Sequence, residues 1–167
     1  KTSKASLEVV QKYCGHIRNG LKIRNTYKEE IVIAGMLKKQ DYISVLSQVD
    51  CFVMPSRGEA FCIPGLECMA LGIPSLYTDG IGMDYCIGES IDSRLEPCFG
   101  ATETLPNLDT AETAWREIDI IKLAKAMRSW YNSENMKSSV RKDCLEQAKK
   151  YDHKSVGMKI KELLNDS

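Results

Sequence analysis

One stretch, Pro55 to Gly72, constrains the fold of this chain more than any other. It reads PSRGEAFCIPGLECMALG and follows the apolar run Cys51 to Met54, which is typical of a strand buried on both faces of a parallel sheet. A helix is predicted next, because Pro64 suits the first helical position and Gly72 suits the position just past the end, where a positive φ is needed. Strand, loop and helix form half of a βαβ unit, and the end of such a strand is where α/β sheets bind anionic ligands.

Two carboxylates frame this loop and the start of the helix. Glu59 lies in the loop, and Glu67 is expected in the first turn of the helix, with its side chain leaning back toward the loop. One ionised carboxylate can accept hydrogen bonds from two neighbouring hydroxyls, which a ribose or a hexose presents as a vicinal diol. The alternative is that Glu67 only complements the helix dipole, contributing about 0.3–1 kcal/mol, and that Glu59 is solvated.

The remaining patterns predict the α/β class, with a Rossmann-like parallel sheet flanked by helices and a helical C-terminal region. Strands are expected at Ile31–Ala34, Cys51–Met54, Ser75–Thr78 and near Ser93–Cys98, and early helices at Ser3–Arg18 and Gln40–Gln48. Asp119 and Asp152 are predicted to cap late helices. The apolar stripes of these helices are expected to face the core, and they comprise Ile120, Leu123, Ala124, Met127, Trp130 and Tyr131, and later Val156, Ile160, Leu163 and Leu164.

Composition excludes several classes of protein. The chain has 167 residues, enough for a single domain, and its 23 basic and 23 acidic residues give no electrostatic case for nucleic acid or an anionic membrane. No apolar run approaches the roughly 20 residues of a membrane span. The seven cysteines form no Cys-x2-Cys pair, so a zinc knuckle is not expected and a reduced, cytoplasmic protein is. Because the chain opens at Lys1 without a methionine, it is expected to be a fragment.

The organising stretch resembles the Glu-x7-Glu signature of retaining GT-B glycosyltransferases, the glycosyl transferases group 1. That family typically reads P-S-x-x-E-G-F-G-L-P-x-L-E-A-M-A-x-G-x-P at this place. Eleven positions match in register, namely Pro55, Ser56, Glu59, Phe61, Pro64, Leu66, Glu67, Met69, Ala70, Gly72 and Pro74. Ala60 and Cys62 stand where the family usually has glycines, which let the backbone approach the donor closely.

By this resemblance, residues 1–167 are the C-terminal, donor-binding domain of a longer GT-B enzyme, without its first strand and its N-terminal acceptor domain. The resemblance makes Glu59 the catalytic position, as a residue that binds the donor sugar and not as a covalent nucleophile. Ala60, Phe61, Cys62 and Ile63 join Glu59 in binding the donor sugar and phosphate. Glu67 is implied to bind the ribose, and Gly35, Met36 and Leu37 to line the base pocket.

The implied function is transfer of a hexosyl unit from a UDP- or GDP-linked sugar to an acceptor, with retention at the anomeric carbon. The resemblance implies no cofactor and no metal, and an acceptor bound by the missing domain. The isolated chain is therefore expected to be inactive, and peripheral membrane association of the parent stays open. Two alternatives remain, a GT-B sugar-nucleotide epimerase and a non-catalytic nucleotide-sugar-binding module, and Ala60 and Cys62 favour the second. A doubly wound dehydrogenase would need a Gly-x-Gly-x-x-Gly fingerprint, which this chain lacks.

Overall fold

A computed structural model of the chain describes residues 12, 15, 36–98 and 113–165. The chain divides into two units, Lys1–Ser44 and Val45–Ser167. The predicted strand Ile31–Ala34 lies outside the described residues, and so does the predicted helix Ser3–Arg18 apart from two helical residues. Helix α2 (Lys39–Leu46) confirms the helix predicted at Gln40–Gln48, with small differences at both ends.

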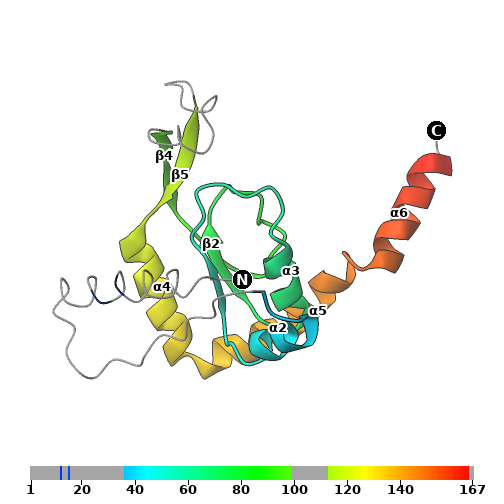
Figure 1. The fold of residues 1–167 in the computed structure, drawn as a ribbon, viewed down its shortest axis with the longest axis horizontal. Coiled ribbons are helices and arrows are strands. Elements are labelled where there is room, and N and C mark those ends of the chain that lie inside the picture. The colour runs from blue at the N-terminus through cyan, green and yellow to red at the C-terminus, as the bar shows by residue number, and fades with distance from the viewer. Residues whose placement is uncertain (1–11, 13–14, 16–35, 99–112, 166–167) are drawn as a thin grey trace. The chain divides into compact units, whose positions relative to one another are not determined.

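A parallel sheet of three strands organises the second unit. Its strands β1 (Phe52–Met54), β2 (Ser75–Thr78) and β3 (Gly88–Ile91) lie in the order β1-β2-β3 (Figure 1). Both pairings are parallel, which confirms the predicted α/β class and the parallel alignment of the first two strands. Strand β3 was not predicted, because three of its four residues are exposed and it carries no apolar run.

A second, antiparallel pair of strands follows β3 in the chain. Strand β4 (Ser93–Pro97), which the sequence predicts, pairs with β5 (Ala114–Ile118), which it does not. The two strands pair across their whole length, from Ser93 opposite Ile118 to Pro97 opposite Ala114. Strand β5 leads directly into helix α4 (Ile120–Asn132), whose N-cap is the predicted Asp119.

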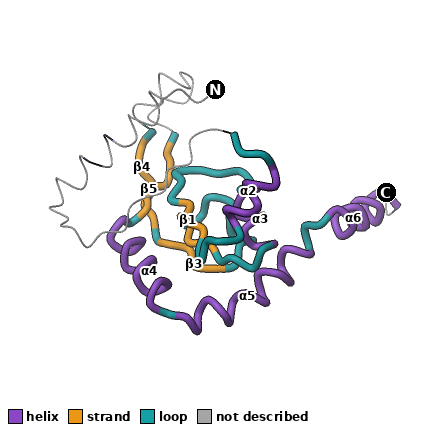
Figure 2. Tube along the Cα trace, turned by 60° about the horizontal axis from the view of Figure 1, so that its bottom comes forward, coloured by secondary structure: helices purple, strands orange, loops and turns teal. Residues whose placement is uncertain are grey.

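Helices cover both faces of the parallel sheet. Helix α3 (Ile63–Ala70) and helix α4 lie on opposite sides of it, and α5 (Glu134–Lys149) runs from α4 to α3 (Figure 2). Adjacent residues of β2 pack on opposite faces of the sheet, because side chains alternate along a strand. Leu76 packs with Trp130 of α4, whereas Tyr77 packs with Met83 in the cluster beside α3.

The late helices bury less apolar surface than their patterns predict. In α4, Trp130 is buried and its indole N–H donates to Glu89 of β3 at 2.8 Å. Four other residues of the stripe predicted to face the core are exposed, namely Ile120, Ala124, Met127 and Tyr131. The stripe of α6 (His153–Asn165) was wrongly predicted to face the core, since Val156, Ile160, Leu163 and Leu164 are 39% to 73% exposed. Amphipathic spacing marks a face suited to burial, but it does not supply a covering element.

Both predicted helix caps are confirmed by their hydrogen bonds. The Asp119 carboxylate accepts from the backbone N–H groups of Ile121 and Lys122, each at 3.0 Å. The Asp152 carboxylate accepts from the backbone N–H of Ser155 at 2.7 Å. The six cysteines among the described residues are free thiols. No described helix has the length and apolar character needed to span a bilayer.

Candidate functional site

Two loops meet at the carboxyl edge of the parallel sheet. The first runs from Pro55 to Cys62 and joins β1 to α3, and the second runs from Asp79 to Ile87 and joins β2 to β3. Because β1 and β2 are parallel, both loops leave the sheet at the same edge. The predicted donor-site residues therefore lie at the edge where α/β sheets bind their ligands.

Gly82 brings the two loops into direct contact. A Cβ at this position would lie 3.0 Å from the carbonyl oxygen of Glu59 and 3.1 Å from that of Ala60. The backbone of Gly82 also has a φ of +80°, a conformation that L side chains rarely adopt. Only glycine meets both requirements, so Gly82 sets how closely the second loop supports the Glu59–Ala60 backbone.

The Glu59 carboxylate stays close to its own loop. It is half-buried, and one of its oxygens accepts from the backbone N–H of Ala60 at 3.0 Å. Ala60, Phe61 and Ile63 are exposed, whereas Cys62 is 1% exposed. Within the segment Glu59–Ile63, Cys62 is therefore the buried position, and the residues on either side of it are exposed next to the helix N-terminus.

The position of Glu67 differs from the prediction. Helix α3 begins at Ile63, so Pro64 is its second residue, and the first turn contains no acidic residue. Glu67 lies instead in the second turn and is half-buried. The helix starts earlier than expected because Cys62, with a φ of −78° and ψ of 89°, already acts as the N-cap and its carbonyl accepts from the Leu66 N–H at 3.2 Å.

The end of α3 is as predicted. Gly72 follows the helix with a φ of +77°, in the left-handed region. The N–H of Gly72 donates to the carbonyl of Met69 at 3.0 Å, and the N–H of Ile73 donates to that of Cys68 at 2.9 Å. These two bonds form a Schellman motif, which satisfies the last carbonyls of the helix and turns the chain toward β2.

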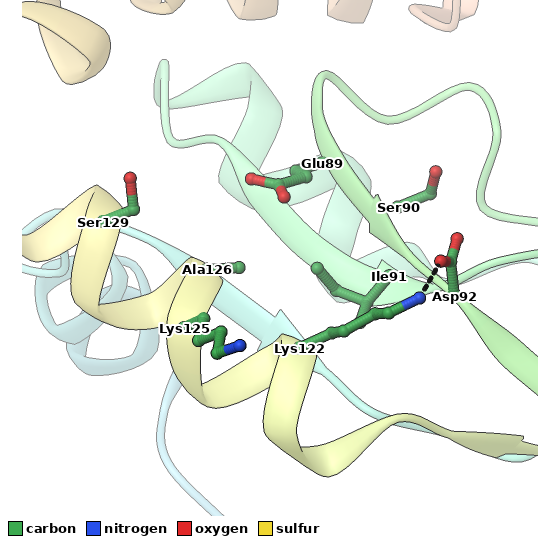
Figure 3. A pocket seen from close by; sticks show the side chains of 8 residues that line it. All are labelled: Glu89, Ser90, Ile91, Asp92, Lys122, Lys125, Ala126 and Ser129. Atoms are coloured by element: carbon green, nitrogen blue, oxygen red, sulfur yellow. Dashed lines mark hydrogen bonds and ion pairs between the residues drawn. The ribbon is translucent and has the colours of Figure 1, made fainter.

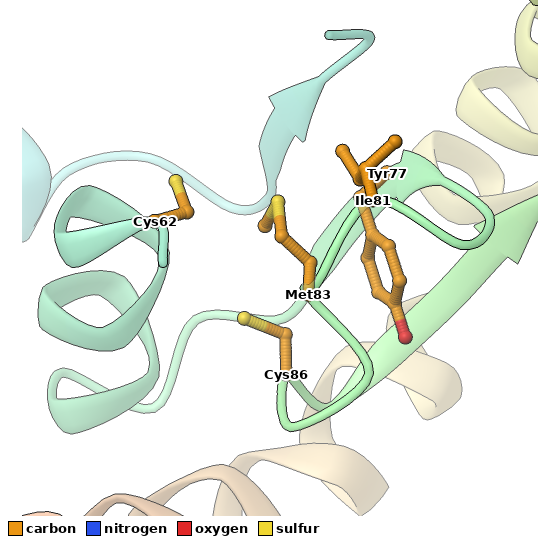
Figure 4. Packing of buried hydrophobic residues seen from close by; sticks show 5 residues of the cluster. All are labelled: Cys62, Tyr77, Ile81, Met83 and Cys86. Atoms are coloured by element: carbon orange, nitrogen blue, oxygen red, sulfur yellow. The ribbon is translucent and has the colours of Figure 1, made fainter. Parts of the chain in front are cut away.

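The Cys62 thiol points away from the exposed face of the loop. It lies in a buried cluster with Tyr77, Ile81, Met83 and Cys86 (Figure 4). Burial raises the pKa of the Cys62 thiol, so this side chain is a neutral packing group. Gly65 closes the cluster, because a Cβ there would lie 3.1 Å from the Met83 methyl group and 3.2 Å from the Cys86 sulfur.

The strand pair β4–β5 holds the start of the first loop. The Arg57 guanidinium forms an ion pair with Glu117 at 2.7 Å and lies 4.3 Å from the centre of the Trp115 ring. The carbonyl of Arg57 accepts from the backbone N–H of Arg116 at 3.0 Å. Sequence reasoning missed this contact, because Arg57 and Glu117 are 60 residues apart and β5 was not predicted.

The same strand also supports the second loop. The Arg116 guanidinium lies against Gly80, where a Cβ would be 2.7 Å from one of its nitrogens. Its other terminal nitrogen lies 3.7 Å from the Asp79 carboxylate and 3.4 Å from the Ser93 hydroxyl. Arg116 and Arg57 thus connect β5 to both loops of the candidate site.

Cavities lie beside the loops and on the flank of the sheet. One of about 440 Å³ borders the first loop at Pro55 and Arg57. Another, of about 380 Å³, lies between β3 and α4, where Lys122 forms an ion pair with Asp92 (Figure 3). This second cavity contains none of the predicted site residues.

The predicted base pocket stays a prediction. Gly35 lies outside the described residues. Met36 is fully exposed and Leu37 is 38% exposed, and both belong to the first unit of the chain.

Comparison with known proteins identifies the family of this chain. The model of the family "Glycosyl transferases group 1" matches residues 8–98, more than half of the chain, a range that includes Glu59, Glu67 and Gly82. Searches of curated proteins and of solved structures give no significant match. The chain therefore belongs to the glycosyl transferases group 1 family, whose members catalyse glycosyl transfer.

Proposed function

We propose that the protein transfers a hexosyl unit from a nucleoside-diphosphate sugar, UDP- or GDP-linked, to an acceptor hydroxyl with retention at the anomeric carbon. Glu59 binds the donor sugar, and Glu67 binds the ribose hydroxyls. Ala60, Phe61, Cys62 and Ile63 provide the backbone that meets the sugar and the diphosphate. In the reaction, the bond from the anomeric carbon to the diphosphate oxygen breaks, a bond to the acceptor oxygen forms, and the departing diphosphate takes up the proton of the acceptor hydroxyl.

One observation carries this proposal, namely the contact of Gly82 with the backbone of Glu59 and Ala60. It fixes a carboxylate-bearing loop immediately before a helix N-terminus, at the carboxyl edge of the sheet. The first N–H groups of a helix lack intrahelical acceptors, and together with the helix dipole they favour a bound anion. A leaving diphosphate is such an anion, so its charge can be stabilised here without a metal ion.

A non-catalytic nucleotide-sugar-binding module is the second candidate, favoured by Ala60 and Cys62 in place of glycines. The geometry of Cys62 weakens that argument. Its φ of −78° is accessible to any residue, and its side chain is buried in the protein core instead of filling the loop surface. Ala60 is the departure that still supports a binding module, because its side chain is on the exposed face.

The reaction is tested with a panel of UDP- and GDP-linked hexoses and the protein that contains residues 1–167. We expect slow hydrolysis of one of these donors, with the released sugar carrying the donor's anomeric configuration when followed by NMR, and no loss of rate on addition of a chelator. Release of the opposite anomer would contradict retention. Binding without any turnover, with or without candidate acceptors, would favour the module.

The division of labour between the two glutamates is tested by Glu67→Gln and Glu59→Gln. Each keeps the side-chain shape but removes the charge and one acceptor. Charge-assisted hydrogen bonds contribute about 1.5–3 kcal/mol each, so Glu67→Gln should weaken nucleoside diphosphate and nucleotide sugar alike. Glu59→Gln should weaken only the nucleotide sugar. Calorimetry with both ligands measures this contrast, and equal losses for both variants would refute the assignment.

A further inference from the structure

Three aromatic rings lie close together at the end of the first loop, although they come from distant parts of the chain. Phe61 belongs to the first loop, Tyr85 to the second, and Tyr151 follows helix α5. The rings of Phe61 and Tyr85 are stacked, with centroids 4.6 Å apart and planes inclined by 11°. The Tyr151 ring lies 5.3 Å from Tyr85 and 6.1 Å from Phe61. Offset stacking of this kind contributes about 0.5–1.5 kcal/mol beyond area burial, enough to favour one loop conformation.

The Tyr85 hydroxyl adds a polar contact to the stack. It donates to the carbonyl oxygen of Cys62 at 2.7 Å. The same carbonyl oxygen also accepts the first hydrogen bond of α3, from the Leu66 N–H at 3.2 Å. A carbonyl oxygen has two lone pairs, so it can accept from the Leu66 N–H and the Tyr85 hydroxyl at once. Burial raises the pKa of Tyr85, and the hydroxyl therefore stays protonated and able to donate.

Tyr85 is itself held from the opposite side. Its carbonyl accepts from the side-chain amide of Gln147 in α5 at 3.2 Å, and its ring contacts Tyr151. The next residue, Cys86, is buried in the cluster below α3. Tyr85 therefore lies between helix α5 and the first loop, and it contacts two consecutive residues of that loop, Phe61 with its ring and Cys62 with its hydroxyl.

We propose that Tyr85 is a positioning residue for the donor site, which holds the Phe61 ring and the Cys62 carbonyl so that the backbone from Glu59 to Ile63 keeps a single conformation. The proposal rests on the proposed function, because this segment is assigned there to the donor sugar and diphosphate. Tyr85 acts through the loop backbone, and its own hydroxyl is occupied by Cys62.

The test is Tyr85→Phe, which keeps the stacked ring and removes the hydroxyl. A net hydrogen bond of ordinary strength corresponds to about a threefold to tenfold change in an equilibrium constant. We expect Tyr85→Phe to weaken the nucleotide sugar by this factor in calorimetry and to leave the affinity for the matching nucleoside unchanged. Tyr77→Phe is the matched control, since Tyr77 belongs to the buried cluster against which Tyr85 packs, and it should change neither affinity.

A second measurement needs no ligand. Amide hydrogen exchange should be about threefold to tenfold faster between Phe61 and Leu66 in Tyr85→Phe, while the amides of α4 exchange as in the wild type. Unchanged exchange and affinity would overturn the proposal, and so would uniform losses of protection, which indicate general destabilisation. If the wild type binds no nucleotide sugar, the proposed function fails, and the exchange result alone decides whether Tyr85 holds the loop.

Discussion

Gly82 and Gly58 lie in neighbouring loops, but the surroundings of their α-carbons differ completely. A Cβ at Gly58 would meet nothing within 4 Å, and its φ is not in the left-handed region. A Cβ at Gly82 would press on two carbonyl oxygens and require a positive φ. The contact between the first and second loops therefore requires that residue 82 has no Cβ.

We therefore expect Gly82→Ala to destabilise the fold and to displace the Glu59–Ala60 backbone. A residue other than glycine in the left-handed region costs about 1–2 kcal/mol, and the close carbonyl contacts add to this. Urea unfolding should show a loss of about 1–3 kcal/mol, together with weaker nucleotide-sugar binding.

Gly58→Ala is the matched control for this substitution. It has free space and no backbone strain, so stability should stay within about 0.5 kcal/mol of the wild type. If Gly82→Ala and Gly58→Ala lower stability and nucleotide-sugar affinity equally, then neither the positive φ nor the loop contact at Gly82 contributes to the stability or to the binding.

At the scale of single residues, the sequence predicts what depends on local geometry. Asp119, Asp152 and Gly72 were assigned correctly because caps and left-handed turns involve residues only two to four positions away. Tyr85 was missed, because its partner Cys62 is 23 positions earlier in the chain and no periodic pattern links them. The helix begins one residue earlier than predicted, which moves Glu67 from the first turn into the second, since Pro64 suits the second helical position as well as the first.

At the scale of elements, helix α4 shows how a single cap supports the packing of a whole segment. Its N-cap carboxylate accepts two backbone N–H groups, and its far end buries Trp130 against the sheet. Asp119→Ala removes the only side-chain acceptor at this terminus among the described contacts. We expect a loss of about 0.5–2 kcal/mol in urea unfolding.

Asp119→Asn distinguishes the contribution of the capping hydrogen bonds from that of the negative charge. Its amide oxygen can still accept from Ile121 and Lys122, so its stability should lie close to that of the wild type, since asparagine caps helices as well as aspartate. A loss as large as that of Asp119→Ala would show that the carboxylate acts through its charge instead.

Burial explains which elements the sequence could predict. Strand β2 is buried along its whole length and carries no charged residue, whereas β3 and β5 carry exposed and charged residues that are also common in loops. The apolar face of α6 was assigned to the core because helical spacing gives the direction of a stripe but not its partner. The first loop, Pro55 to Cys62, lies between a strand and a helix as predicted, but its support by β5 depends on a pairing between distant residues.

At the scale of the whole molecule, four buried thiols lie on elements that pack against one another, namely the first loop, α3, the second loop and α5. Cys62, Cys68, Cys86 and Cys144 are each no more than 5% exposed. Burial raises the pKa of each, to about 12 for Cys68 and about 11 for Cys144, from an ordinary value of 9.0. Because the folded state disfavours the thiolate, these groups link global stability to alkaline pH.

The sign of this linkage gives the last prediction. Below about pH 9 the thiols are protonated in both states, and their contribution to stability is complete. Between about pH 9 and pH 11 the unfolded thiols lose their protons while those of Cys68 and Cys144 in the folded state still hold theirs, so the unfolded state is favoured and stability falls. The effect of Cys144 is complete near pH 11 and that of Cys68 near pH 12. Urea unfolding at pH 8, 9.5 and 10.5 measures the slope, to which lysines and tyrosines also contribute.

Cys144→Ser isolates the contribution of one thiol, because serine does not titrate in this range. Its stability should be lower than that of the wild type at pH 8, since a hydroxyl replaces a buried thiol, but should fall less steeply as the pH rises. The pH dependence therefore distinguishes the linkage from simple loss of packing, which would shift stability equally at every pH. Parallel curves for the two proteins would show that the Cys144 thiol ionises as readily in the folded chain as in the unfolded one.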